Sequence, residues 1–145
     1  MPPVGLSIRR ILPAPARRVF EAWTRPELMA RWFFPDDGWS VDVKARVEVG
    51  GRYELSMRDP EGNLHRQFGE YREIVPVSRI VFTWCCPDFA VVDSVVTVDL
   101  FDQGHETELV LTHELLDNPD IRRSHEQGWT GCLNQLNNML EKERD

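Results

Sequence analysis

Cysteine, long apolar runs and positive charge are all scarce in this sequence of 145 residues. Its three cysteines, Cys85, Cys86 and Cys132, are odd in number and lack CxxC spacing, so they fit neither a disulfide framework nor a cysteine-based metal site. We therefore predict reduced thiols. No apolar run approaches the roughly 18 residues of a membrane span, and the first residues lack the basic start and apolar segment of a secretory signal. These absences predict a soluble, cytoplasmic protein.

Basic residues are outnumbered, with 17 Lys and Arg against 24 Asp and Glu and a net charge of −7. Such a chain repels phosphate backbones, which argues against nucleic acid as a partner. The sequence also lacks the GxSxG elbow of hydrolases and the glycine-rich loops that bind nucleotides. His113 and His125 alone fall short of the three or four ligands that zinc requires. We therefore predict neither a metal nor a cofactor.

The composition that remains is that of a globular protein, with 41% hydrophobic and 28% charged residues. The length suits a single domain over residues 1–145. Residues 4–12 resemble a strand, residues 16–23 have one apolar helical face, and a second short helix is predicted to begin at Pro26. The chain therefore starts with a strand followed by two short helices.

From residue 39 to residue 114 the apolar pattern has a period of two, with turn residues at strand spacing, which predicts an antiparallel meander. Alternate residues share a face. The pattern in residues 64–75 does not separate apolar from polar positions. The predicted inner face carries Tyr53, Leu55, Met57, Ile80, Phe82, Trp84, Val92, Val96, Val98, Leu100, Leu109, Leu111 and His113.

One long helix is predicted from residue 119 to about residue 142, after the segment Asp117-Asn118-Pro119, which supplies a cap and a first-turn proline. Gly128 and Gly131 lie in its middle, where each costs roughly 1 kcal/mol relative to alanine, so close packing or cavity space is expected to compensate. Its apolar stripe consists of Ile121, His125, Trp129, Cys132, Leu133, Leu136 and Leu140. The fold class is therefore α+β: a curved antiparallel sheet of six to seven strands around a long C-terminal helix.

Local phrases recur in the order typical of a known family. They are residues 14–24 with Pro26, Trp32-Phe33, Gly50-Gly51-Arg52-Tyr53, residues 59–62, 69–76, 79–84 and 107–113, and Gly128-Trp129. Together with the order of the elements, these phrases resemble the START-like superfamily, also called SRPBCC, Bet v-like or helix-grip. They are most similar to the branch homologous to the C-terminal domain of the activator of the heat-shock-protein-ninety ATPase. The resemblance spans nearly the whole chain, and it implies an apolar cavity between sheet and helix.

Aromatic residues are the richest candidates for a binding site, because they fill cores and also line ligand cavities. His113 and His125 lie on inner faces, and a hydrogen-bonded core histidine is the favoured interpretation of His113. The predicted ligand-binding residues are Trp39, Tyr53, Phe68, Tyr71, Phe82, Trp84, His113, His125 and Trp129. No catalytic residue is assigned.

Three hypotheses of function remain open. The first is a module that binds a small hydrophobic or amphipathic ligand, with a role in stress. The second is a cyclase, hydratase or hydrolase that uses His113 or His125 as acid or base. The third is a module that contacts a chaperone through an exposed face. The sequence shows no nucleophile or cofactor fingerprint, which favours binding over catalysis, and it leaves open whether the chain is a monomer or a homodimer.

Overall fold

The computed structural model describes residues 5–144. The predicted N-terminal strand begins at Gly5, and Val4 lies outside the described residues. Along the chain the elements are β1 (Gly5–Leu12), α1 (Ala16–Thr24), α2 (Pro26–Met29), β2 (Ser40–Ala45), β3 (Arg52–Arg58), β4 (Leu64–Val75), β5 (Arg79–Cys86), the short 3-10 helix η1 (Pro87–Phe89), β6 (Val91–Asp102), β7 (Thr107–Glu114) and α3 (Pro119–Arg144).

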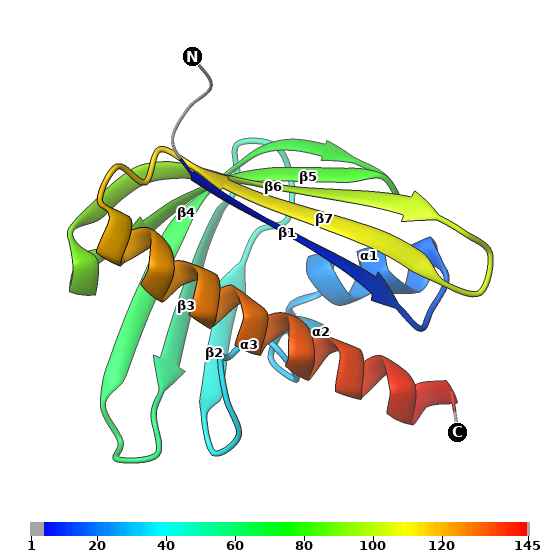
Figure 1. Cartoon of the computed structure of the whole chain (residues 1–145), viewed down its shortest axis with the longest axis horizontal. Helices are drawn as coiled ribbons and strands as arrows, with labels where there is room; N and C mark the ends of the chain where they lie inside the picture. The colour runs from blue at the N-terminus through cyan, green and yellow to red at the C-terminus, as the bar shows by residue number, and fades with distance from the viewer. Residues whose placement is uncertain (1–4, 145) are drawn as a thin grey trace.

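Residues 5–144 form one seven-stranded antiparallel sheet in the order β1-β7-β6-β5-β4-β3-β2. The first strand pairs with the last, and Leu6 lies opposite His113. The sheet curves around α3, and α1 and α2 lie on the same side of the sheet as α3 (Figure 1). This arrangement confirms the predicted α+β helix-grip fold.

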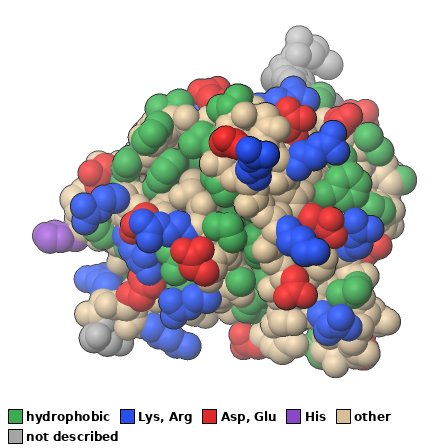
Figure 2. Space-filling view, turned by 180° about the vertical axis from the view of Figure 1, so that it is seen from behind, with side chains coloured by type: hydrophobic (Ala, Val, Ile, Leu, Met, Phe, Trp, Pro, Cys, Tyr) green, Lys and Arg blue, Asp and Glu red, His purple; other side chains and the backbone are tan. Residues whose placement is uncertain are grey.

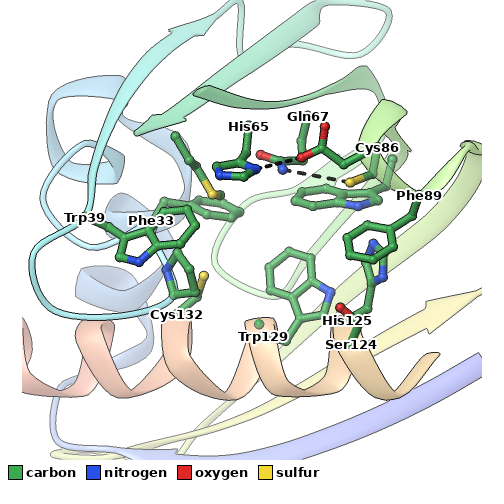
Figure 3. A pocket seen from close by; sticks show the side chains of 15 residues that line it. Phe33, Trp39, His65, Gln67, Cys86, Phe89, Ser124, His125, Trp129 and Cys132 are labelled. Carbon is green, nitrogen blue, oxygen red and sulfur yellow. Dashed lines mark hydrogen bonds and ion pairs between the residues drawn. The ribbon is translucent and has the colours of Figure 1, made fainter. Parts of the chain in front are cut away.

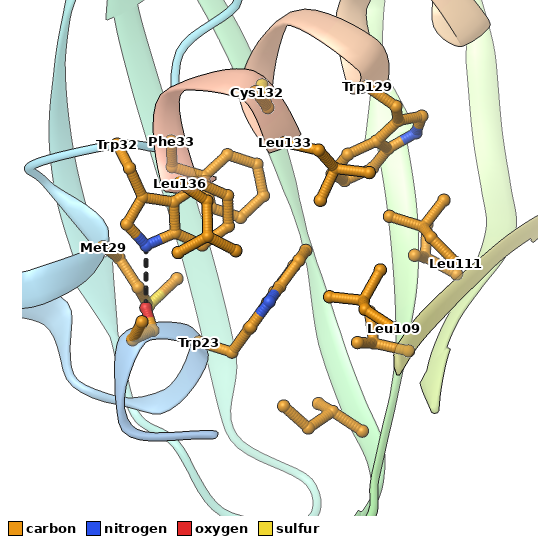
Figure 4. Close-up of a cluster of buried hydrophobic side chains, with 14 of the residues drawn as sticks. Trp23, Met29, Trp32, Phe33, Leu109, Leu111, Trp129, Cys132, Leu133 and Leu136 are labelled. Atoms are coloured by element: carbon orange, nitrogen blue, oxygen red, sulfur yellow. Dashed lines mark hydrogen bonds between the residues drawn. The ribbon is translucent and has the colours of Figure 1, made fainter. Parts of the chain in front are cut away.

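The core lies between the inner face of the sheet, the two short helices and one side of α3 (Figure 4). Strand residues at alternate positions, such as Leu109 and Leu111 in β7, are fully buried because they point toward the helix. Trp32 is also fully buried, and its Nε1–H donates to the carbonyl of Ala22 at 2.9 Å. This bond holds the end of α1 against the segment that follows α2.

The start and the buried face of α3 follow the sequence pattern. Asn118 caps the helix, because its side-chain oxygen accepts hydrogen bonds from the backbone N–H groups of Asp120 and Ile121. A side chain at Gly131 would place its Cβ 1.9 Å from the carbonyl oxygen of Pro35, so the backbone of the α2–β2 connection packs directly on the helix. Close packing thus explains one of the two mid-helix glycines.

Two strands depart from simple alternation. In β4, polar residues such as His65 and Gln67 occupy inward positions, which is why the sequence pattern was ambiguous there. In β6, the prediction that Val92 faces inward is wrong, because its side chain is 74% exposed. The pairing of β5 with β6 shifts between Trp84 and Cys86, and Asp93 adopts a left-handed backbone with φ of 52°. This irregularity shifts the alternation at the start of β6 by one residue, so that Val91 is buried and Val92 points outward.

Candidate functional site

A pocket of about 310 Å³ lies between the sheet and α3. Its walls come from the α2–β2 connection, β3, β4, β5, η1 and α3, so segments far apart in the sequence meet around it (Figure 3). The volume is at the lower end of the range for small-molecule sites. The fold therefore builds one concave apolar site on its inner face.

Five aromatic side chains dominate the walls: Phe33, Trp39, Trp84, Phe89 and Trp129. The ring centroids of Trp84 and Trp129 lie 4.9 Å apart, and those of Phe33 and Trp129 lie 5.6 Å apart. These rings come from the sheet, the connection after α2 and the helix, so they hold one another in place. Their faces offer apolar contact to a flat molecule.

His113 anchors the Trp129 ring from behind. The indole N–H of Trp129 donates to His113 Nδ1 at 3.0 Å. His113 Nε2 lies 2.8 Å from the hydroxyl of Ser94, whose own proton is donated to the carbonyl of Trp84 at 2.7 Å. His113 Nε2 must therefore carry the imidazole proton. Burial, helped by the nearby His125, lowers the pKa of His113 to about 3, which keeps the ring neutral.

His65 bridges two acidic residues at the rim. Its Nε2 lies 2.9 Å from Asp59 in the β3–β4 turn, and its Nδ1 lies 2.7 Å from Asp88 in η1. The hydrogen bonds to Asp59 and Asp88 raise the pKa of His65, and the bond to His65 lowers the pKa of Asp59. The Trp39 ring lies 5.2 Å from the imidazole. This cluster ties η1 to the sheet beside the pocket.

Three buried polar atoms of the lining residues have no hydrogen-bond partner among the described residues. They are Gln67 Oε1, Trp84 Nε1 and His125 Nε2. Gln67 and His125 are each only 7% exposed. The other polar ends of these two side chains are engaged, Gln67 Nε2 with Cys86 Sγ at 3.9 Å and His125 Nδ1 with the carbonyl of Ile121 at 2.9 Å.

Comparison with protein families matches residues 13–141 to the Activator of Hsp90 ATPase homolog 1-like proteins. The chain belongs to this family. The match covers most of the sheet and nearly all of α3, so the predicted START-like assignment is confirmed. A comparison with curated proteins found no match.

Solved structures of bacterial proteins share the fold. A protein from Chromobacterium violaceum is 28% identical, covers 96% of this chain and 99% of its own, and superposes with a TM-score of 0.82. One from Rhizobium leguminosarum is 30% identical, with 94% and 93% covered and a TM-score of 0.79. The AHSA1 protein from Silicibacter pomeroyi, 23% identical over 95% and 98%, has a TM-score of 0.83 and supports the fold alone.

Within this member of the Activator of Hsp90 ATPase homolog 1-like family, the pocket brings together four of the nine residues predicted to bind a ligand. Trp39, Trp84, His125 and Trp129 all line it. Trp39 stands at the rim and is half-buried, whereas the other three are buried. The sheet thus contributes Trp84 to the pocket, and α3 contributes His125 and Trp129.

The other five predicted residues lie elsewhere. Tyr53, Tyr71 and Phe82 pack on one another with ring centroids 5.5 to 6.1 Å apart, beside a cavity of only about 10 Å³. His113 is fully buried behind Trp129. Phe68 is on the opposite face of the sheet, 38% exposed, because its neighbour Gln67 takes the inward position.

Several lining residues were not among the predicted site residues. Met57 and Cys132 belonged to the predicted inner patterns, and Gly128 was expected to be compensated by close packing or cavity space, but none of the three was selected. Burial raises the pKa of the Cys132 thiol, so it lines the wall in its neutral form. Gln67 and Phe89 had no usable signal: one is polar in an ambiguous strand, and the other lies in η1, whose position depends on tertiary packing.

A second groove, of about 650 Å³, lies on the outer face of β2 to β5 and includes Phe68. Its described lining mixes charges of both signs, with Arg66 paired to Glu54 at 3.1 Å. Figure 2, seen from behind, likewise shows positive, negative and hydrophobic side chains interspersed over the face in view. Charged residues of both signs thus line this groove, whereas aromatic and apolar residues dominate the inner pocket.

Within residues 5–144, no group of three or more His, Cys, Asp and Glu residues is arranged to hold a metal ion. None of the helices in the same range has the combined length and apolar character required to cross a bilayer. The aromatic pocket is therefore the candidate site.

Proposed function

We propose that this chain is a binding module whose pocket takes a small, largely apolar, flat molecule. The observation that carries the proposal is the set of five aromatic side chains, from the sheet, η1, the α2–β2 connection and α3, that converge on one concave site. Burial of aromatic and aliphatic surface supplies most of the affinity in such sites. The ligand would lie between the indole rings of Trp84 and Trp129 on one side and Trp39 at the rim.

Gly128 supports the proposal. It lines the pocket from α3, and a Cβ added there would meet no described atom within 4 Å apart from its chain neighbours and the backbone of its own helix. Neither packing nor an unusual backbone angle accounts for it, and a mid-helix glycine costs roughly 1 kcal/mol relative to alanine. The space that Gly128 leaves in the pocket would accommodate a ligand, which provides a reason for a glycine at this helix position.

Catalysis has less support. Both ring nitrogens of His113 are engaged, with Trp129 and Ser94, so this histidine is better suited to positioning than to proton transfer. His125 retains an unpaired Nε2, but burial lowers its pKa and no described hydroxyl or carboxylate bonds to it. The contact with a chaperone that the family name suggests would use an outer surface, where the described groove carries mixed charges.

The test is calorimetric titration of the full chain with a panel of bicyclic aromatics that includes 2-naphthol and indole. We expect a dissociation constant on the order of 0.1 mM for at least one member, as for other ligands of this size. Gly128→Leu fills the pocket and should abolish the heat of binding. The matched control is Asn134→Leu, which adds the same side chain to the exposed side of α3.

Two results would count against the proposal. One is a folded protein that binds no member of the panel. The other is equal binding by the wild type and by Gly128→Leu, because that would place the bound molecule outside the pocket. Circular dichroism of both variants establishes that α3 and the sheet are intact before binding is compared.

A further inference from the structure

The polar atoms of the pocket determine which ligands it can recognise. Buried polar groups are almost always hydrogen-bonded in native proteins. Within the described part of the chain, four buried side-chain atoms lack a partner, and three of them belong to residues that line this pocket. Such a concentration at one site indicates that a bound molecule supplies the missing partners.

The free nitrogen of His125 is an acceptor. Its Nδ1 lies 2.9 Å from the carbonyl oxygen of Ile121, which can only accept, so Nδ1 carries the proton. Burial lowers the pKa of His125, which keeps the ring neutral and leaves a lone pair on Nε2. The group that completes this site must therefore donate a hydrogen bond.

Gln67 presents a second acceptor. Its amide nitrogen donates to Cys86 Sγ, and its carbonyl oxygen Oε1 has no partner within residues 5–144. Figure 3 shows Gln67 on the sheet side of the pocket and His125 on the helix side. The indole N–H of Trp84 is the one unpaired donor of the set, and the hydroxyl of Ser124 can serve in either role.

The pocket carries no charge suited to an anion. Among the described lining residues there is no Lys or Arg. The one cation that can form is the His65 imidazolium, and both of its ring nitrogens are already bonded to carboxylates, those of Asp59 and Asp88. A carboxylate or phosphate entering the pocket would lose its hydration without gaining a counter-ion.

We propose that the pocket selects uncharged aromatic molecules that bear a hydroxyl or N–H donor, and that it rejects anionic amphiphiles such as carboxylates. This inference rests on the proposed binding function. At the packing density of protein interiors, about 310 Å³ holds roughly ten to fifteen non-hydrogen atoms, the size of a bicyclic molecule. A hydroxyl fits the polar set because it can donate to Gln67 Oε1 or His125 Nε2 and accept from an indole N–H.

The experiment compares three probes of the same bicyclic frame by calorimetry at pH 7. They are 2-naphthol, which has a donor; 2-methoxynaphthalene, which has none; and naphthalene-2-carboxylate, which is ionised. The wild-type chain should bind 2-naphthol about tenfold more tightly than 2-methoxynaphthalene, the value of roughly one well-formed hydrogen bond. The carboxylate should bind most weakly of the three.

A variant isolates the acceptor. Gln67→Met keeps the size of the side chain and removes Oε1, so it should weaken 2-naphthol and leave 2-methoxynaphthalene unchanged. A loss caused only by altered packing would weaken both probes alike. Gln103→Met, in the exposed turn between β6 and β7, is the matched control and should alter neither.

The outcomes separate this inference from the function on which it rests. If the three probes bind the wild type with equal affinity, or the carboxylate binds best, the donor requirement is wrong while the binding function stands. If none of the three binds, both fail. Preference for 2-naphthol that disappears in Gln67→Met supports both.

Discussion

At the scale of single residues, His113 shows how a buried histidine can fix a pocket wall. Trp129 donates to Nδ1, and Nε2 donates to Ser94, which in turn donates to the Trp84 carbonyl. An imidazolium could not accept the Trp129 bond. One neutral ring thus links Trp84 and Trp129, two of the three pocket tryptophans, and burial lowers the pKa of His113 to about 3.

This lowered pKa makes a prediction about acid stability. Between about pH 6.5, where an unfolded histidine titrates, and about pH 3, the unfolded chain takes up a proton at His113 that the folded chain does not. Protonation of His113 in the unfolded chain therefore lowers the free energy of unfolding as the pH falls from about 6.5 to about 3. Above about pH 6.5 this loss is absent, because the ring is neutral in both states. This part of the pH dependence of stability should disappear when His113 is replaced by a residue that does not titrate.

His113→Leu should lower the free energy of unfolding at pH 7 by about 1–3 kcal/mol, because the indole N–H of Trp129 loses its acceptor in a buried site. The decline between pH 6.5 and pH 4 should also become shallower than in the wild type. Urea denaturation across this range measures both quantities. His105→Leu, in an exposed turn, is the control. An unchanged pH dependence in His113→Leu would contradict the account.

At the scale of elements, α3 carries two glycines with opposite roles. Gly131 allows the backbone of Pro35 to lie against the helix, since a Cβ there would fall 1.9 Å from the Pro35 oxygen. Gly128 faces the pocket, and the space around it is open among the described atoms. The same residue type thus serves close packing at one position and cavity volume at the other.

Alanine substitutions distinguish the two roles. Gly128→Ala should raise the free energy of unfolding by up to about 1 kcal/mol, because alanine is the better helix former. Gly131→Ala should lower it despite the same gain in helix propensity, because the helix or the Pro35 segment must move. Chemical denaturation of both variants provides the comparison, and a shift of both in the same direction would refute this assignment.

The elements themselves were largely predictable from the sequence. Period-two alternation in β3, β5 and β7 and the stripe on α3 reflect burial on one face, which is a local property of the chain. Prediction failed where an inward polar residue or an irregular backbone interrupts that pattern. Polar Gln67 occupies an inward position in β4, and the left-handed Asp93 turns Val92 outward in β6.

At the scale of the whole molecule, the site depends on contacts that no local pattern encodes. The sheet order places β5 and η1 across from α3, so Phe89 reaches His125 with ring centroids 5.4 Å apart. Aromatic content predicted a lining, but it could not separate the pocket residue Trp84 from the core residue Phe82, because both lie on the same face of one strand. The volume left between packed side chains decides that difference.

The central claim is that the pocket between the sheet and α3 binds a small aromatic molecule, and the five tryptophans test it most directly. Trp39, Trp84 and Trp129 line the pocket, whereas Trp23 and Trp32 lie in the core beside it. A nitrogen–proton NMR titration with 2-naphthol reports all five indole N–H groups at once. We predict large shifts for the three pocket tryptophans and small ones for the other two. No shift, or shifts confined to residues of the outer groove such as Phe68 and Arg66, would contradict the account.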